Sequence, residues 1–503
     1  MKNIFKIVVL SSLSVLAASC ESFLDVNVNP NAPVNENLTL SAKLPAALNS
    51  TAAQEAVQLN QLGAFWGGYW GTTSEALALF NDIKYYDGVG IRGSRDGIQI
   101  WENTYNILLY YKLIKDQAEA EQSPFYAGIS KIMMGWHFIR LVDIYNNVPF
   151  DGALQGTNVP QPVYQPGAEV YRKSIDLITE GIQDIRSASV APANDDIFFG
   201  GNKTLWAKFG NTVKLRALLQ QSEVSSQSGY IAAEIQNIVQ EGSGFLGVGE
   251  NAYSNPGYLN TSGKLNPFYE TFYRNAGGAT VANHTNIRPT EYLIHKYGTL
   301  NDPRLEKIYQ TANGVFKGVK FGNLVASEEY NTENTSALKG PAENSNQPAG
   351  LLKSFDQPAV ILSSFESLFL QAEAAERGWI GGDAATYYNQ AIAASFVYIG
   401  LDGEQATIYI AQPAVSLGEA GNRIARIIEQ KWLAINSVNS FQAWNDFRRL
   451  GLPDFPNSES APSATARPLR LMYPETELQT NREEVNKQGG DDITKNRVWW
   501  DPE

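Results

Sequence analysis

Apolar side chains recur at helical spacing in two long stretches of the chain, and this periodicity is the feature that most constrains the fold. A segment such as 166–185 places Val170, Ile175, Ile178 and Ile182 on one face. The same spacing predicts further helices over residues 100–115, 124–145, 204–220, 363–379, 421–437 and 440–450. Each apolar face must be buried against a partner. We therefore expect a mainly α-helical fold.

Two of these helices form a hairpin by pattern. Leu368, Ala372, Ala375 and Trp379 share one helix face, and the pair Gly381-Gly382 then interrupts the helix. A second helical face follows directly, formed by Ala385, Tyr388, Ile392 and Phe396. Short antiparallel helices with alanines at the crossing are typical of a tetratricopeptide unit, although its Trp-Leu-Gly signature is degenerate here.

The middle of the chain has a different composition. Residues 241–360 are rich in Gly, Asn, Pro, Ser and Tyr and lack long periodic stretches. We predict one domain over residues 39–503 rather than three. Its parts are a helical scaffold at about 39–240 and 361–455, an irregular, loop-rich, ligand-facing insertion at about 241–360, and an irregular tail at 456–503.

The N-terminus contains the only cysteine of the 503 residues. Residues 1–19 combine lysines, an apolar stretch and small residues, which is typical of a secretory signal peptide. Cys20 follows Ala-Ala-Ser, and this resembles the lipobox of bacterial lipoproteins, in which the cysteine is acylated. The alternative is an ordinary signal peptide with a coincidental cysteine. Residues 20–38 are expected to form a lipidated tether, so that the lipid alone anchors the protein.

Several functions are disfavoured by composition. The formal net charge of -13 argues against a nucleic-acid partner. One cysteine cannot form an internal disulfide or a multi-cysteine metal site, and only three histidines are present. The sequence contains no HExxH, GxSxG or P-loop motif. We expect no enzyme activity, cofactor or metal, and a glycosidase with paired carboxylates is the least favoured alternative.

Several strings together resemble the SusD/RagB-like family of outer-membrane nutrient-binding lipoproteins. The most specific of them are FESLFLQAEAAERGW at 365–379 and IIEQKWLAINSVNSFQAWNDFRRLGLP at 427–453. Others are CESFLDVNVNPN at 20–31, VDIYNNVPF at 142–150, GNKTLWAKFGNTVKLRALL at 201–219, NPFYETF at 266–272, LNDPRL at 300–305, RLMYPETELQTN at 470–481 and RVWWD at 497–501. The resemblance covers nearly the whole chain.

The resemblance implies a scaffold of tetratricopeptide-like helical hairpins. It also implies a location on the outer face of the outer membrane and a SusC-like TonB-dependent transporter as partner. Most members of the family bind a glycan or oligosaccharide, and a RagB-like branch binds peptides. A mainly structural lid of the transporter is a further alternative.

Sugar binding needs flat apolar faces and a few planar polar groups, and three regions offer aromatic candidates. The string AFWGGYWGT at 64–72 contains Trp66, Tyr69 and Trp70 around a glycine pair. The alternative is that its two tryptophans, four residues apart, form one buried stripe. The remaining candidates are Tyr85, Tyr86, Tyr258, Tyr273 and Arg274.

Overall fold

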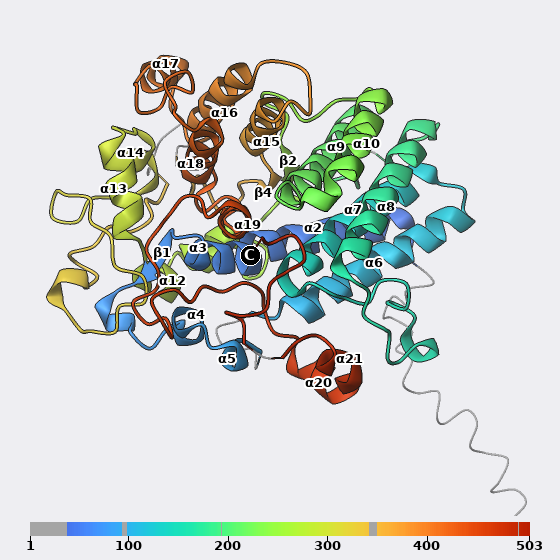
Figure 1. The fold of residues 1–503 in the computed structure, drawn as a ribbon, viewed down its shortest axis with the longest axis horizontal. Coiled ribbons are helices and arrows are strands. Elements are labelled where there is room, and N and C mark those ends of the chain that lie inside the picture. Colours follow the sequence, from blue (N-terminus) through green and yellow to red (C-terminus); the bar gives the residue numbers. More distant parts are fainter. Residues whose placement is uncertain (1–37, 93–97, 193, 342–349, 491, 503) are drawn as a thin grey trace, which may run out of the picture.

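Helices form most of the structure, a computed structural model that describes residues 38–92, 98–192, 194–341, 350–490 and 492–502. The predicted signal peptide, Cys20 and nearly all of the predicted tether lie outside the described residues. Pairs of antiparallel helices pack side by side around a common core (Figure 1). The mainly α, tetratricopeptide-like architecture predicted from periodicity is therefore confirmed.

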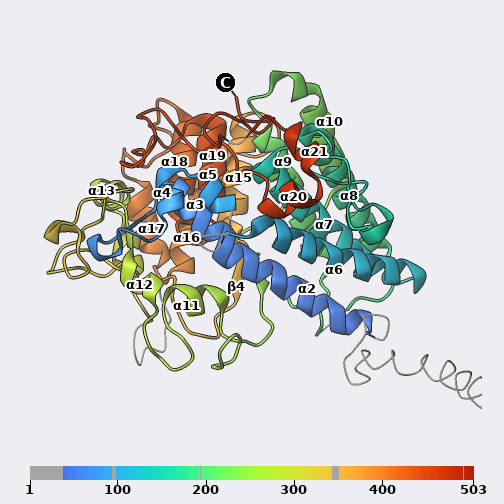
Figure 2. The same cartoon turned by 90° about the horizontal axis from the view of Figure 1, so that it is seen from below.

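A long central helix divides the molecule. It consists of α2 (Leu40–Gln54), a π-helical turn η3 (Glu55–Leu59) and α3 (Asn60–Trp66), which continue one another with helical dihedral angles. In the view from below, this helix runs diagonally through the molecule, with helices on both sides of it (Figure 2). Glu55 in the π-helical turn is buried and accepts hydrogen bonds from Trp136 Nε1 at 2.7 Å and Arg140 Nε at 3.1 Å.

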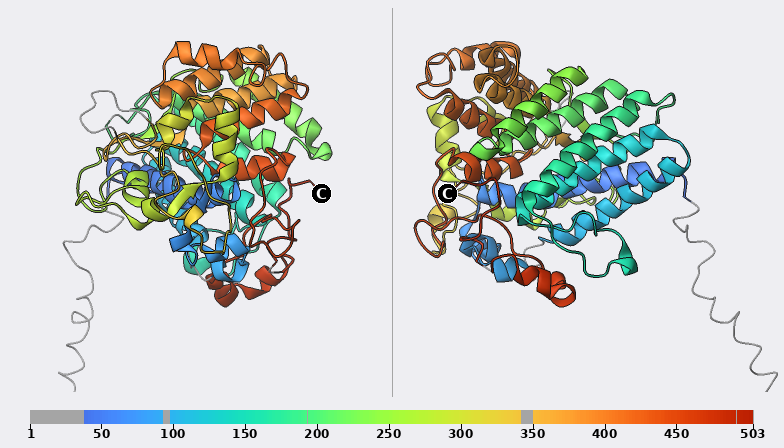
Figure 3. Two further views of the ribbon diagram at one scale, coloured as in Figure 1. Left: turned by 90° about the vertical axis from the view of Figure 1, so that its left-hand side faces the viewer. Right: turned by 45° about the vertical axis from the view of Figure 1, so that its right-hand side comes forward.

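One layer of helices stacks beside α2 in chain order (Figure 3). It contains α6 (Ile100–Ala120), α7 (Pro124–Tyr145), α8 (Gly167–Ser187), α9 (Lys203–Gln220) and α10 (Ser228–Glu241). Helices α7 and α8 approach each other closely, since a Cβ at Gly128 would lie 2.5 Å from the Gly181 carbonyl oxygen. Two facing glycines thus allow the two backbones to touch.

A second group of helices lies on the other side of the molecule (Figure 1). It contains α15 (Ser364–Glu376), α16 (Ala384–Tyr398), α17 (Gly403–Ile410), α18 (Arg423–Ile435) and α19 (Phe441–Leu450). Helix α19 ends as the sequence predicts, because Gly451 adopts the left-handed conformation with φ of 67°. Arg449 of α19 bonds the carboxylate of Glu373 on α15, with Nη2 to Oε2 at 2.9 Å.

The segment between the two helix groups contains short elements. They are β2 (Ala252–Ser254), α11 (Pro267–Phe272), α12 (Ala282–Asn286), β3 (Ile287–Pro289), α13 (Glu291–Thr299), α14 (Arg304–Ile308) and β4 (Ala359–Leu362). Strand β3 pairs antiparallel with β1 (Trp70–Thr72), and β2 pairs antiparallel with β4. The first pairing fixes this segment to the end of the central helix.

Short helices close the lower face, namely α4 (Asn81–Tyr85), α5 (Gly88–Arg92), α20 (Glu475–Thr480) and α21 (Arg482–Asn486) (Figure 1). None of the helices in the described part of the chain is long and apolar enough to cross a membrane.

Candidate ligand-binding site

The three aromatic residues of the string at 64–72 lie in the core. Trp66, Tyr69 and Trp70 are 3%, 0% and 1% exposed. Their polar atoms have protein partners: Trp66 Nε1 donates to the Ile83 carbonyl, and the Tyr69 hydroxyl donates to the Trp432 carbonyl at 2.6 Å. Trp70 Nε1 donates to Ser437 Oγ. The structure therefore corrects the expectation that these residues face a ligand, because helix α3 and strand β1 turn their side chains inward.

One glycine of this string, Gly68, lies at a pocket although it is itself buried. Gly68 lines a pocket of about 170 Å³ and adopts a φ of 83°, a conformation that favours glycine. We call this cavity the Gly68 pocket; its other lining residues are Thr290, Glu291, Tyr292, Val319, Lys320, Phe321, Phe455, Pro456, Asn457 and Glu459. They come from four segments that are far apart in the sequence.

Backbone hydrogen bonds hold these segments together. Thr290 Oγ1 donates to the Gly68 carbonyl at 2.7 Å and also caps α13 by accepting from the Leu293 amide. The Glu291 amide donates to the Val319 carbonyl, and the Glu459 amide donates to the Phe321 carbonyl, both at 2.9 Å. The frame of the pocket is thus fixed largely by main-chain groups.

Three aromatic rings form the apolar walls, and a further ring packs against each one. Tyr292 lies 5.7 Å from Trp432, Phe321 lies 6.1 Å from Phe65, and Phe455 lies 4.5 Å from Phe447, measured between ring centroids. Tyr292 is half-buried, so part of its ring faces solvent. Rings fixed in this way offer flat apolar surface at little entropic cost.

Polar groups surround the rings. Lys320 Nζ lies 3.2 Å from Glu459 Oε1 at the exposed rim, and the hydrogen bond to this carboxylate raises the pKa of Lys320. The Tyr330 hydroxyl donates to Glu291 Oε1 at 2.9 Å. Planar amides and carboxylates beside aromatic faces suit the hydroxyl groups and the C–H faces of a sugar ring.

Tyr86 supports this pocket from behind. It is buried, and its hydroxyl donates to Asn457 Oδ1 at 2.6 Å. Burial raises the pKa of Tyr86 to about 12, so the phenol stays protonated and keeps donating at neutral pH. The expectation for Tyr86 is corrected in the same sense as for Trp66: the residue positions Asn457 and does not itself line the pocket.

The size of the pocket limits what it can hold. Its volume of about 170 Å³ is below the ~300–1,000 Å³ of cavities that enclose a whole ligand. It is open on one side, where Lys320 and Glu459 are exposed. One small unit of a longer ligand fits inside, and the rest of the ligand would lie on the outer surface of the protein.

A family model described as starch-binding and associating with the outer membrane, SusD-like, matches residues 34–474. The chain belongs to the SusD-like family. No protein with a curated description matches it.

Solved structures of SusD homologues share its fold. One from Bacteroides uniformis is 22% identical, with a TM-score of 0.73 over 92% of this chain and 99% of that one. One from Bacteroides fragilis is 20% identical, with a TM-score of 0.75 over 92% of this chain and 100% of that one. A chitin-binding SusD homologue from Flavobacterium johnsoniae is 21% identical, with a TM-score of 0.73 over 91% of this chain and 98% of that one.

Tyr258 lies in a different part of this SusD-like fold. It lines a cleft of about 340 Å³ beside α2, where its hydroxyl is 3.2 Å from Asn49 Oδ1, and only 8% of it is exposed. A neighbouring cleft of about 440 Å³ between α2 and α6 contains the exposed Tyr110. Both clefts include Ala53, so they flank the same turn of α2.

The other predicted residues are dispersed. Tyr273 is buried, and its ring packs against His284 and against the Arg274 guanidinium, whose carbon lies 4.9 Å from the ring centroid. This arrangement corrects the expectation for Tyr273, because its hydroxyl end packs against Gly340. Arg274 is half-buried, and Tyr85 at the end of α4 is exposed. Neither lines the Gly68 pocket.

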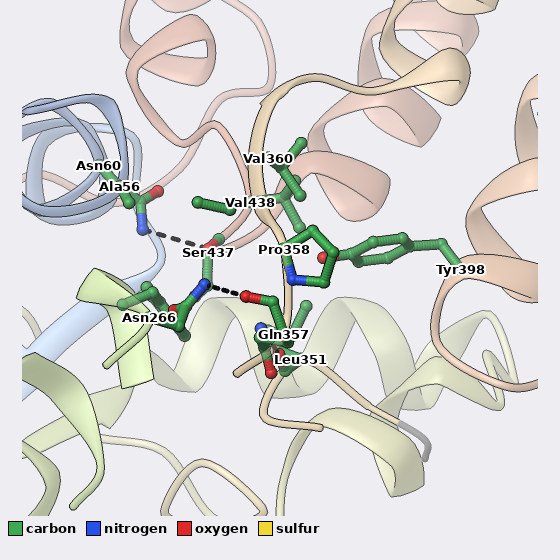
Figure 4. A pocket seen from close by; sticks show the side chains of 12 residues that line it. Ala56, Asn60, Asn266, Leu351, Gln357, Pro358, Val360, Tyr398, Ser437 and Val438 are labelled. Atoms are coloured by element: carbon green, nitrogen blue, oxygen red, sulfur yellow. Dashed lines mark hydrogen bonds between the residues drawn. The ribbon is translucent and has the colours of Figure 1, made fainter. Parts of the chain in front are cut away.

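A much smaller cavity joins the irregular segment to the scaffold (Figure 4). Its volume of about 30 Å³ is enough for a water molecule but not for a sugar ring. Asn266 Nδ2 donates to the Gln357 carbonyl and Asn60 Nδ2 donates to the Ser437 carbonyl at its edge. This cavity is a structural junction. Within the described ranges, no three His, Cys, Asp or Glu side chains are grouped to hold a metal ion.

The rings that line the Gly68 pocket were not predicted from the sequence, namely Tyr292, Phe321 and Phe455. A signal was present, since Phe321 precedes Gly322 and Phe455 lies between Asp454 and Pro456. Aromatic residues next to Gly or Pro lie in turns at the surface more readily than those in a periodic helix. Their convergence is a three-dimensional fact that spacing does not encode.

Proposed function

We propose that this SusD-like protein binds an oligosaccharide, with one sugar unit in the Gly68 pocket. The observation that carries the proposal is the convergence of Tyr292, Phe321 and Phe455 with polar side chains in one open cavity. Apolar walls with a few convergent polar groups are the usual composition of a small-molecule site. The family description as starch-binding and the chitin-binding relative support a glycan as the ligand.

The same proposal places the protein at the outer face of the outer membrane. The predicted lipidation of Cys20 and the family description, which associates these proteins with the outer membrane, support this location. The ligand would then pass to a SusC-like TonB-dependent transporter. Co-purification of the tagged protein with a TonB-dependent barrel encoded beside its gene tests this part, and a protein that always purifies alone contradicts it.

Binding itself is tested by isothermal titration calorimetry against neutral oligosaccharides and against peptides of similar length. Saccharide binding without peptide binding is the expected result, because the pocket has three aromatic walls and the charges of Lys320 and Glu459 at its exposed rim are paired with each other. Binding of peptides alone contradicts the glycan assignment and favours the peptide-binding alternative. Binding of neither class favours a structural role.

A further inference from the structure

Four arginines gather in a second, larger cleft. It has a volume of about 590 Å³ at the C-terminal end of α19, and Arg448, Arg449, Arg467 and Arg497 line it. Glu223 is the only acidic residue among its lining residues in the described part of the chain. This composition is unusual for a chain of net charge -13. The volume lies within the ~300–1,000 Å³ of cavities that enclose a ligand.

Two of these arginines already have carboxylate partners. Arg449 bonds Glu373 and also Asp446, with Nη2 to Oδ1 at 3.0 Å. Arg497 Nη1 donates to Asp501 Oδ1 at 2.6 Å. Arg497 is partly exposed and contributes N–H groups to the cleft. The Asp501 carboxylate offsets part of its positive charge.

Arg448 has no such partner. Its guanidinium carbon lies 3.6 Å from the centroid of the Trp444 ring and 4.7 Å from that of Trp500. Its Nη atoms donate to the carbonyls of Asp143 and Leu469 and to Asn445 Oδ1, and its Nε has no partner. No carboxylate of the described residues forms an ion pair with it, although Asp501 and Asp143 lie near enough to interact with its charge and only 6% of the residue is exposed. Burial lowers the pKa of Arg448 to about 10.

Arg467 is held in the same manner nearer the surface. Its guanidinium carbon lies 4.9 Å from the Phe447 ring and 5.3 Å from the Phe455 ring. Its Nη atoms donate to the carbonyls of Phe455 and Pro456, and none of the described carboxylates pairs with it. Rings and carbonyls thus fix the plane of the guanidinium, and the charge of Asp454 acts on it without forming an ion pair.

The cleft adjoins the Gly68 pocket. Phe455 lines that pocket, and its carbonyl accepts the 2.7 Å hydrogen bond from Arg467, which lines the cleft. Phe455 and its neighbour Pro456 thus separate the two cavities, and further units of a saccharide held in the pocket would lie near the arginines. This proximity favours a substituted saccharide over an unrelated anion.

We propose that the cleft of Arg448, Arg449, Arg467 and Arg497 binds an oxyanion carried by an acidic saccharide. Carboxylates of uronic acid units and sulfate esters share the required chemistry, since each accepts two parallel N–H bonds from a guanidinium. Arg467 and Arg497 supply the accessible donors, and buried Arg448, which forms no ion pair, supplies further positive charge. The charge of Arg449 is balanced by Glu373 and Asp446. The proposal extends the proposed function to acidic glycans and rests on it.

Calorimetry on the full-length protein in detergent tests this inference with four probes. They are trigalacturonate, its neutral methyl ester, a sulfated disaccharide and a peptide with a free C-terminal carboxylate. The variants are Arg467→Gln, Arg467→Lys and Arg497→Gln. Arg172→Gln is the matched control, because Arg172 is exposed and also lies over an aromatic ring, Tyr230, at 4.9 Å. Thermal unfolding shows which variants remain folded.

We expect trigalacturonate or the sulfated sugar to bind more tightly than the methyl ester. Arg467→Gln and Arg497→Gln should each lower the affinity for the acidic probe by about 10- to 100-fold, because a charge-assisted hydrogen bond is lost. Arg467→Lys should have a smaller effect, and Arg172→Gln none. The preferred acidic probe identifies the carboxylate or the sulfate as the ligand group.

Equal affinity for trigalacturonate, the sulfated sugar and the methyl ester overturns the inference. The inference is also overturned if Arg467→Gln lowers the affinity for acidic and neutral probes equally, because the effect then comes from packing. Tighter binding of the peptide than of either acidic sugar overturns the saccharide assignment. If neutral oligosaccharides still bind under any of these outcomes, the proposed function stands. Failure of the acidic-saccharide inference can therefore be distinguished from failure of the proposed function.

Discussion

Phe455 occupies the space in which any other residue at position 68 would carry its side chain. A Cβ built on Gly68 would lie 2.6 Å from the Phe455 ring, and Gly68 has a φ of 83°. The glycine therefore meets two demands at once: a left-handed backbone and contact with an aromatic wall of the pocket.

Gly68→Ala should lower both stability and saccharide affinity. The left-handed backbone costs a non-glycine residue about 1–2 kcal/mol, and the Cβ must also displace the Phe455 ring. Urea unfolding and calorimetry measure the two effects. Gly156→Ala is the control, because Gly156 also has a positive φ, of 55°, but has no atom within 4 Å of its added Cβ. Equal losses in both variants would show that Phe455 contributes nothing.

The contact between α7 and α8 gives a second prediction. Gly128→Ala places a methyl group 2.5 Å from the Gly181 carbonyl, which is backbone and cannot rotate away. We expect a loss of about 1–3 kcal/mol in the free energy of unfolding. Gly229→Ala in α10, where no atom lies within 4 Å, should be neutral or slightly stabilising. A Gly128→Ala protein as stable as wild type would contradict the close packing of these helices.

The helical part of the fold could be predicted from sequence because its signals are local. Helix α7 begins at Pro124 and ends at Tyr145 as expected, since proline favours the first helical turn and the apolar face is periodic. The end of α19 at Gly451 follows from the same kind of local rule. Spacing of this kind reports which residues are buried by a neighbouring helix.

The site could be predicted only in part. The string at 64–72 contributes Gly68 to the pocket, whereas its large rings lie in the core. Aromatic composition alone does not distinguish a ring that supports a site, such as Trp432, from one that lines it, such as Tyr292. Pairing of β1 with β3 brings the two segments together, and strands this short leave little periodic signal.

The ion pair between Glu373 and Arg449 predicts sensitivity to acid. Burial alone would raise the pKa of Glu373, but the Arg449 guanidinium lowers it to about 2. Because the folded pKa lies below the ordinary value of 4.5, the pair stabilises the fold above about pH 4.5, and this contribution is lost as the pH falls toward 2. Glu373→Gln should lose about 3–5 kcal/mol at pH 7, because it leaves Arg449 without its main partner.

Urea unfolding at pH 7 and at pH 3 checks this expectation. The stability difference between wild type and Glu373→Gln should shrink at the lower pH. Glu376→Gln is the control, since Glu376 pairs with Arg423 at 2.8 Å but both side chains are partly exposed, and it should cost less than about 1 kcal/mol. A difference for Glu373→Gln that is independent of pH would contradict a lowered pKa.

Lipid anchoring is tested by Cys20→Ala. A protein with several acyl chains on Cys20 stays with the membrane, whereas the unacylated chain should be released into the soluble fraction. Fractionation followed by immunoblotting measures the distribution, and Cys20 is the only cysteine, so no other thiol can substitute. Retention of the variant in the outer-membrane fraction would mean that another feature anchors the chain.

The central claim is that the Gly68 pocket holds the sugar, and one comparison tests it most directly. Tyr292→Leu removes a flat wall from the pocket but keeps an apolar side chain. Tyr387→Leu, another half-buried tyrosine, lies on α16 and does not line the pocket. Calorimetry of both variants should use the tightest saccharide found for the wild type. Loss of a stacking ring should weaken binding to Tyr292→Leu by about 10-fold or more and leave Tyr387→Leu unchanged. Wild-type affinity in a folded Tyr292→Leu protein would contradict the claim and direct attention to the clefts beside α2.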